Sequence, residues 1–297
     1  MSDIKRVLVV GATGMLGRPV VRRLIEEGFV VRALARDVDR ARTLLPAACQ
    51  IVRGDVRDDA LLLAALDGCD QAYINLSEPM VKRPPPWSIE VEGTRAVVAA
   101  CRACGVRRVM RISAMGVDDA ADQWWAAKCK RDADRALMES DVEWTVVRPT
   151  WLMESLCTLR IGGGLMLCPD LPQSPLRWIS GDDYARQVAA AFQSTNAIRK
   201  VYQPQGPENL TIRQAVKRFC AAWRNDRRRI MSMPIWPMRM GRAFSGRSHY
   251  LTSLLDMTRD HFSRIDREAI STDLPAARMT IEDYARYVER TGDWPRK

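Results

Sequence analysis

Three glycines near the start of the chain, Gly11, Gly14 and Gly17, follow a short β-branched run at residues 7–10. An apolar segment that is compatible with a helix follows them through Ile25. A strand, a glycine turn and a helix in this order gather unpaired backbone N–H groups and the positive end of a helix dipole, which favours a bound pyrophosphate. Glycine permits the tight turn, the close approach of the phosphates and the packing of helix against strand. The pattern therefore predicts a dinucleotide-binding turn.

A second predicted strand, residues 29–35, ends at Arg36 and Asp37, about 20 residues beyond the glycines. At this position a carboxylate selects the ribose 2′-hydroxyl of the cofactor, whereas an arginine accepts a 2′-phosphate. Arg36 comes first and Arg40 follows one turn later, so we favour NADPH. Asp37 keeps NADH as the alternative, and the arginines could instead be solvated loop charges.

Composition is that of an ordinary globular protein, with 47% hydrophobic and 28% charged residues among 297. The chain has no apolar run of the roughly 18–20 residues that span a bilayer. Its first residues lead straight into the first predicted strand and leave no room for a signal peptide. We therefore expect a cytoplasmic protein without a transmembrane segment.

Eight cysteines are scattered along the chain, and only Cys101 and Cys104 form a C-x-x-C pair. No second cysteine pair or histidine pair completes a tetrahedral metal site. In a chain without export signals, scattered cysteines are expected to be buried thiols. We expect neither disulfides nor a metal ion.

The formal net charge is +10, and the stretch 222–247 holds seven arginines against Asp226 alone. Such a cluster is usually a solvated face, but it would also fit a protein partner or an anionic surface of lipid or nucleic acid. Because no recognition-helix, zinc or aromatic ribonucleoprotein signature accompanies the charge, an anionic surface of lipid or nucleic acid ranks behind a protein partner, and nucleic acid is not expected.

Strands and helices alternate through the first half of the chain. Strands are predicted at residues 7–10, 29–35, 50–55, 71–76, 107–113 and 142–148, and helices at 58–66, 89–103 and 122–139. This alternation predicts a doubly wound α/β fold with a parallel sheet and helices on both faces. Ligands of such sheets bind beyond the carboxyl ends of the strands. We expect residues 1–150 to form the nucleotide-binding domain and residues 151–297 a smaller α/β substrate lobe that closes over the cofactor.

The chain resembles the atypical short-chain dehydrogenase/reductase group, especially its NmrA-like and NAD(P)H-binding reductase members, over about its whole length. The segments that carry the resemblance include Gly11-Ala12-Thr13-Gly14-Met15-Leu16-Gly17, Gly54-Asp55-Val56, Ser113-Ala114-Met115-Gly116 and Arg148-Pro149-Thr150. The resemblance implies a Rossmann-type fold and an NAD(P) cofactor.

The same resemblance implies a set of cofactor contacts at the strand ends. The pyrophosphate would meet Thr13, Met15 and Leu16, and the 2′-phosphate would meet Arg36. The remaining contacts would be Asp55 and Val56 at the adenine, Asn75, Leu76, Ser77 and Ser113 near the ribose and nicotinamide, and Pro149 and Thr150 beside the nicotinamide.

The chain departs from the family where standard members carry Tyr-x-x-x-Lys, a proton-donating tyrosine and a lysine that lowers the tyrosine's pKa. The family's lysine falls on Lys130, which places Ala126 at the tyrosine position. Helical spacing is compatible with a Lys130 that points inward at the ribose and equally with a surface pair between Lys130 and Asp134. Lys130 and Ser113 are therefore the catalytic candidates.

Without a phenolic proton donor, ketone reduction loses an aid typically worth about 10²–10⁴-fold. We therefore predict an NADPH-dependent reductase whose apolar, aromatic or conjugated acceptor is of quinone, enone, imine or azo type. The expected substrate-pocket residues are Trp87, Met115, Trp125 and Trp151. The alternative is a non-catalytic NADP(H) sensor or assembly factor that binds a protein partner through the basic stretch 222–247.

Overall fold

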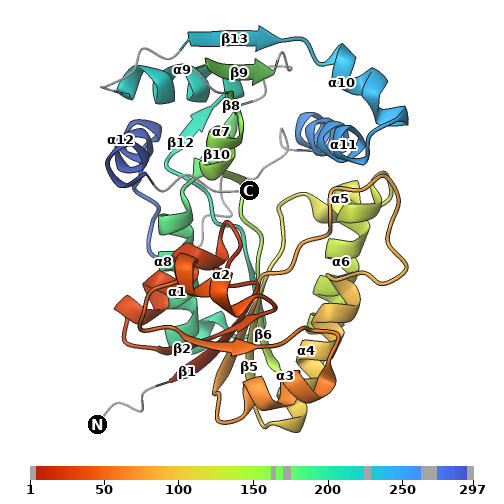
Figure 1. Cartoon of the computed structure of the whole chain (residues 1–297), viewed down its shortest axis with the longest axis vertical. Coiled ribbons are helices and arrows are strands. Elements are labelled where there is room, and N and C mark those ends of the chain that lie inside the picture. Colours follow the sequence, from red (N-terminus) through yellow and green to blue (C-terminus); the bar gives the residue numbers. More distant parts are fainter. Residues whose placement is uncertain (1–4, 162–164, 170–174, 224–228, 262–272, 293–297) are drawn as a thin grey trace.

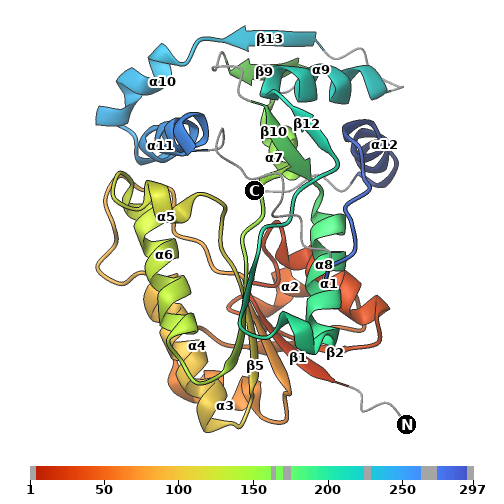
Figure 2. The same ribbon diagram turned by 180° about the vertical axis from the view of Figure 1, so that it is seen from behind.

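The computed structural model describes residues 5–161, 165–169, 175–223, 229–261 and 273–292. A large sheet with helices on both faces forms one part, and smaller sheets and helices lie beyond its carboxyl edge (Figure 1, Figure 2). None of the described helices combines the length and the apolar composition needed to cross a bilayer.

The large sheet has seven parallel strands in the order β11-β6-β5-β4-β1-β2-β3. Their bounds are Arg6–Val10 (β1), Val30–Ala35 (β2), Gln50–Arg53 (β3), Gln71–Ile74 (β4), Arg108–Ile112 (β5), Glu143–Val147 (β6) and Lys200–Tyr202 (β11). The strand order reverses between β1 and β4, which is the switch point where such sheets bind ligands. The predicted doubly wound α/β fold is confirmed.

Helices cover both faces of this sheet. One face carries α1 (Gly17–Glu26), α2 (Val38–Leu44) and α8 (Gly181–Gln193), and the other carries α3 (Asp59–Leu66), α4 (Val91–Ala103) and α6 (Trp125–Met138). The helix predicted at 122–139 begins at Trp125 as α6, because Trp124 has extended backbone, and the short α5 (Val117–Ala120) precedes it.

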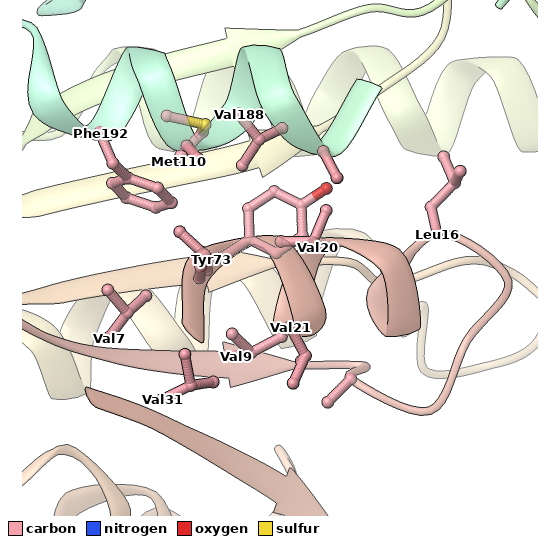
Figure 3. Close-up of a cluster of buried hydrophobic side chains, with 14 of the residues drawn as sticks. Val7, Val9, Leu16, Val20, Val21, Val31, Tyr73, Met110, Val188 and Phe192 are labelled. Atoms are coloured by element: carbon pink, nitrogen blue, oxygen red, sulfur yellow. The ribbon is translucent and has the colours of Figure 1, made fainter. Parts of the chain in front are cut away.

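Alternation of side chains along β1 explains how one strand serves two cores. Val7 and Val9 join the cluster under α1 and α8, whereas Leu8 and Val10 join the cluster under α3 and α4. Figure 3 shows the first of these clusters, in which strand side chains meet Val20 and Val21 of α1 and Val188 and Phe192 of α8. A parallel sheet that is buried on both faces needs this continuous apolar composition.

The smaller part contains two three-stranded sheets and five helices within the described residues. The sheets are formed by β7 (Trp151–Leu152), β10 (Leu176–Ile179) and β12 (Glu208–Leu210), and by β8 (Arg160–Ile161), β9 (Leu165–Pro169) and β13 (Arg229–Met233). The helices are α7 (Glu154–Thr158), α9 (Ile212–Ala222), α10 (Trp236–Met240), α11 (Gly246–His261) and α12 (Ile281–Thr291), with a 3-10 turn at Gly241–Ala243 (η2). The other 3-10 turn, Thr195–Ala197 (η1), follows α8.

The chain returns to the large sheet after it has entered the smaller part. β11 pairs with β6, and α8 packs on α1, so residues 181–202 lie with the first domain. A single division at residue 150 therefore does not separate the two parts in space. The sequence argument missed this because α8 and β11 follow a stretch without clear periodicity.

A hydroxyl pair in the core gives a test of this packing. Tyr73 of β4 and Tyr184 of α8 are fully buried, and their hydroxyl oxygens lie 2.8 Å apart. We expect Tyr184→Phe to lower the free energy of unfolding by about 1–3 kcal/mol, because it leaves the Tyr73 hydroxyl buried without this partner. The double variant Tyr73→Phe/Tyr184→Phe should cost less than the sum of the single changes in urea unfolding. Strictly additive costs would contradict this pairing.

Candidate functional site

A pocket of about 440 Å³ opens at the carboxyl ends of the strands around β1. Ten of the residues that the sequence predicts as cofactor contacts line it: Gly11, Thr13, Gly14, Met15, Arg36, Asp55, Val56, Asn75, Leu76 and Ser77. Arg57 and Ile89 line it too, and the sequence argument missed both. Arg57 lies two residues beyond Asp55, and Ile89 lies just before α4. Their positions in loops near predicted contacts were the one feature of the sequence that could have indicated them.

The glycine turn is fixed by the strand beside it. Gly11 has a φ of +76°, and a Cβ added there would overlap the carbonyl oxygen of Asn75. Asn75 in turn donates from Nδ2 to the Gly11 carbonyl oxygen at 3.0 Å. A Cβ at Gly17 would overlap the carbonyl oxygens of Gly11 and Ala12. The glycines thus allow β1, α1 and the end of β4 to converge, as the spacing predicts.

The N-terminus of α1 follows this turn. No side chain caps it, and its first turn holds no acidic residue. Unpaired N–H groups at a helix N-terminus, with the dipole behind them, suit an anionic phosphate. Leu16, expected as a pyrophosphate contact, and Gly17 are buried and do not line the pocket. Leu16 instead joins the core cluster under α1.

The end of β2 has a positive wall. Arg36 and Arg40 line the pocket, and both the Asp37 carboxylate and Arg57 lie beside them. Asp37 is the N-cap of α2, and its Oδ1 accepts from the Arg40 backbone N–H at 2.9 Å. Asp37 therefore uses one carboxylate oxygen as a helix cap and lines the pocket beside Arg36.

The loop after β3 holds Asp55 at the pocket. Its Oδ1 accepts from the Arg57 backbone N–H at 3.0 Å, and the cap of α3 is Asp58, whose side chain accepts from Leu61. Asp55 is therefore not the cap of the following helix. Val56 lies beside it in the pocket wall and is 5% exposed.

A buried network of charges lies between β5, α4 and α6. Arg111 is 1% exposed and donates to Glu90 Oε2 at 2.5 Å, to Asp134 and, at 3.4 Å, to the Thr94 hydroxyl. Asp134 also accepts from Ser113 Oγ at 2.8 Å and from Arg148 at 2.9–3.0 Å.

Neighbouring carboxylates raise the pKa of Arg148 in this network. Burial alone would lower the pKa of Arg148, but Asp134 and Asp118 beside it raise that pKa above its ordinary value. Its guanidinium therefore stays charged next to the buried carboxylate of Asp134.

Both catalytic candidates belong to this network and do not line the pocket. Lys130 points inward, and its Nζ donates to Glu90 Oε1 at 2.6 Å, with the side chain 17% exposed. The alternative of a surface pair between Lys130 and Asp134 is wrong, because Asp134 is 1% exposed and binds Arg111 and Arg148. The Ser113 hydroxyl donates a hydrogen bond to Asp134.

Pro149 and Thr150, expected beside the nicotinamide, lie in the connection to the smaller part and outside the pocket wall. Thr150 Oγ1 donates to the Arg177 carbonyl oxygen at 2.5 Å. The Thr150 backbone N–H donates to the Pro204 carbonyl oxygen at 3.0 Å. The Pro149 carbonyl oxygen accepts from the Met115 N–H at 3.2 Å. These contacts fix the strand ends together.

Three of the four expected substrate-pocket residues share one apolar cluster, and one does not. Met115 is buried in the cluster of the smaller part, and Trp125 and Trp151 pack against it. Trp87 instead packs on the opposite core, where the Arg57 guanidinium lies 4.7 Å from its ring centroid. Trp87 is therefore placed with the residues of the expected adenine side.

Tyr250 of α11 is a residue that sequence reasoning missed. Its ring contacts Trp124 edge-on with centroids 4.9 Å apart, and Ser77 of the pocket wall is near enough to influence the pKa of its hydroxyl. Burial, with Glu90 and Glu78 nearby, raises the pKa of Tyr250 to about 12, so the phenol is protonated at neutral pH. No local pattern links residue 250 to residue 77, and only the tertiary fold brings them together.

Metal chemistry finds no support in the part of the chain that the structure describes. No group of three His, Cys, Asp or Glu side chains there could hold a metal ion. All eight cysteines are free, and Cys101 is fully buried.

Comparisons with known proteins agree with the pocket. Residues 11–199 match the model of a family described as NAD(P)H-binding. A (4-alkanoyl-5-oxo-2,5-dihydrofuran-3-yl)methyl phosphate reductase from Streptomyces griseus is 31% identical over 212 residues, which cover 70% of each chain. An NAD(P)H azoreductase from Xenophilus azovorans is 28% identical over 221 residues, which cover 73% of each chain.

A solved structure shares the fold. The NADPH complex of an NADPH-dependent quinone oxidoreductase from Escherichia coli superposes with a TM-score of 0.75 at 18% identity, covering 95% of this chain and 99% of that one.

The glycine turn can be tested with a matched pair of variants. Gly11 and Gly28 both have positive φ, but only Gly11 has a neighbour that an added Cβ would overlap. Gly28→Ala should cost about 1–2 kcal/mol of stability through the left-handed backbone, and Gly11→Ala should cost more, because its Cβ would also overlap the Asn75 backbone. Gly11→Ala should also weaken NADPH binding by at least about tenfold in calorimetry, which corresponds to about 1.4 kcal/mol. Equal NADPH affinity of the two variants would contradict the assignment.

Proposed function

The chain belongs to the NAD(P)H-binding family of atypical short-chain dehydrogenases/reductases, and from this premise we propose that it is an NADPH-dependent reductase of an apolar, aromatic or conjugated acceptor. The observation that carries the proposal is the pocket at the switch point. Its glycine turn admits no Cβ at Gly11, and its wall carries Arg36 and Arg40. A dinucleotide with a 2′-phosphate fits both features.

Three groups of residues would bind the pyrophosphate, the 2′-phosphate and the adenine of the cofactor. The turn from Gly11 to Met15 and the start of α1 would hold the pyrophosphate, and Arg36 with Arg40 would hold the 2′-phosphate. Asp55 and Val56 would enclose the adenine. Bound NADPH supplies a hydride, and the protein supplies orientation and exclusion of water.

The proposed class of hydride acceptor follows from the polar side chains that are already hydrogen-bonded within the protein. Lys130 is held by Glu90 and Ser113 by Asp134, and Ala126 offers no phenol. An acceptor that takes hydride readily needs proximity more than acid assistance. The indole N–H groups of Trp124 and Trp125 are buried and have no hydrogen-bond partner among the described residues. They would serve an oxygen or nitrogen of such an acceptor.

Tyr250 is the group that we propose as the proton donor in place of the missing family tyrosine. Ser77, which lines the pocket, influences the pKa of this hydroxyl, and the phenol is protonated at neutral pH. On reduction of an enone, hydride would form the new C–H bond and the Tyr250 proton would pass to the enolate. The tyrosinate would then regain a proton from water.

The alternative, a non-catalytic NADP(H) sensor or assembly factor, is favoured by one observation. Both catalytic candidates, Lys130 and Ser113, are tied into a buried ion network. This alternative predicts NADPH binding without turnover of any acceptor. Eight free thiols support a reducing compartment such as the cytoplasm for either function.

Cofactor choice gives the first test. We expect Arg36→Ala to weaken NADPH binding by about 10–100-fold and leave NADH binding unchanged, because a charged hydrogen bond contributes about 1.5–3 kcal/mol. Arg42→Ala is the control, since Arg42 is 69% exposed and pairs with Asp39 outside the pocket. Equal loss of both cofactors, or of neither, would remove the role of Arg36.

Turnover gives the second test. The chain should oxidise NADPH with quinones or enones, and Tyr250→Phe should lower the rate with an enone by about 10²-fold. The NADPH dissociation constant should stay the same, and the solvent isotope effect on kcat should change. Tyr202→Phe is the control, because its hydroxyl binds Asp273 on another element. No turnover with quinones, enones, imines or azo compounds would favour the non-catalytic alternative.

A further inference from the structure

Large apolar side chains are exposed together on the smaller part of the molecule. The most exposed are Phe244 at 94%, Met240 at 68% and Trp236 at 63%. Ile230 and Met231 on β13 are also exposed, at 38% and 47%. Both views place β13 and α10 at the outer edge of the fold (Figure 1, Figure 2). Isolated exposed apolar residues are common, but a group of this size marks a contact surface.

A loop of the large domain joins this group. Lys82 Nζ donates to the Ala243 carbonyl oxygen at 3.0 Å, and Gly246 lies against the backbone of residues 80–82. Met80 and Val81 on that loop are 51% and 37% exposed. We call residues 80–82 and 229–247 the apolar–basic surface.

Basic side chains accompany the apolar ones. No acidic residue occurs between Asp226 and Asp256 in the sequence. Arg239 and Arg242 share the single carboxylate of Asp256, at 2.9 and 3.1 Å. Arg224, Arg227 and Arg228 of the same stretch lie outside the described residues.

The basic side chains of this surface influence the pKa of His249. Burial, Arg242 and Lys82 together lower the pKa of His249, which marks a positive local potential.

We propose that the apolar–basic surface binds the face of an anionic lipid bilayer. Tryptophan, phenylalanine and methionine at the tip of a segment, with arginines around them, are the composition of interfacial membrane-binding elements. Apolar side chains enter the headgroup region, and each cation near an anionic surface adds about 1 kcal/mol. A second copy of the chain would bring this surface against like charge, so the charge favours lipid over self-association.

The position of the surface matters for the reductase, and this step depends on the proposed function. The loop that carries Met80 and Val81 begins at Ser77, which lines the cofactor pocket and influences the pKa of Tyr250. A chain docked through this surface would hold its pocket near the bilayer, where apolar quinone-like acceptors dissolve. Lipid binding itself needs no cofactor, so it is measured separately from turnover.

Co-sedimentation of the full chain with vesicles tests the proposal. The unchanged chain should bind vesicles of phosphatidylglycerol and phosphatidylcholine and lose binding in high salt or on pure phosphatidylcholine. The triple variant Trp236→Ser/Met240→Ser/Phe244→Ser should bind at least about 100-fold more weakly, because it removes three apolar anchors. Leu61→Ser/Leu63→Ser is the control, since both leucines are 39% exposed on α3, at the opposite end of the fold.

Two outcomes would overturn the proposal. One is equal binding of the triple variant and the control to anionic vesicles. The other is no vesicle binding by the unchanged chain, together with a dimer in sedimentation that the triple variant abolishes, which would assign the surface to a second copy. Quenching of tryptophan fluorescence by brominated lipids that disappears in Trp236→Phe would place this side chain in the bilayer and support the proposal.

Discussion

The close approach of β1 and β4 at their carboxyl ends is the constraint on which the site depends. At Gly11 the backbone adopts positive φ and lies so near Asn75 that no side chain fits between them. The amide of Asn75 then ties the turn by bonding the Gly11 carbonyl oxygen. These contacts set where α1 begins, and no side chain caps its N-terminus. The proposed phosphate site therefore depends on backbone geometry rather than on polar side chains.

A second constraint is the buried charge around Arg111. Removing two charges from water costs several kcal/mol per ion, and only well-formed pairs with further hydrogen bonds offset this cost. Arg111 meets the condition through Glu90, Asp134 and Thr94. The same network engages Lys130 through Glu90 and Ser113 through Asp134. This engagement is the reason that the proposed proton donor, Tyr250, lies outside the network.

The sequence predicted the parts of the fold that are local and missed those that are assembled from distant segments. Glycine spacing, the apolar strands and Arg36 are readable because a turn, a buried strand and a phosphate contact each need particular residues within about 30 residues. Helical spacing left the direction of Lys130 open, because its partner Glu90 lies 40 residues away at the N-cap of α4. The contacts of the Thr150 hydroxyl with the Arg177 and Pro204 carbonyl oxygens join equally distant segments, so no local pattern predicts them. The return of α8 and β11 to the first sheet was hidden for the same reason.

One loop connects the three functional features of the molecule. The segment after β4 begins at Ser77 in the pocket, passes Glu78, continues through Met80–Lys82 on the apolar–basic surface, and reaches Glu90 in the ion network. Its shape is held by Glu78, which accepts from the Ser88 hydroxyl and the Glu90 N–H, and by Lys82 on Ala243. The loop itself contains no regular helix or strand, so its path is defined by these polar contacts together with the packing of Trp87 and Ile89 on the core. One continuous segment therefore runs from the pocket, past the surface of the smaller part, to the ion network.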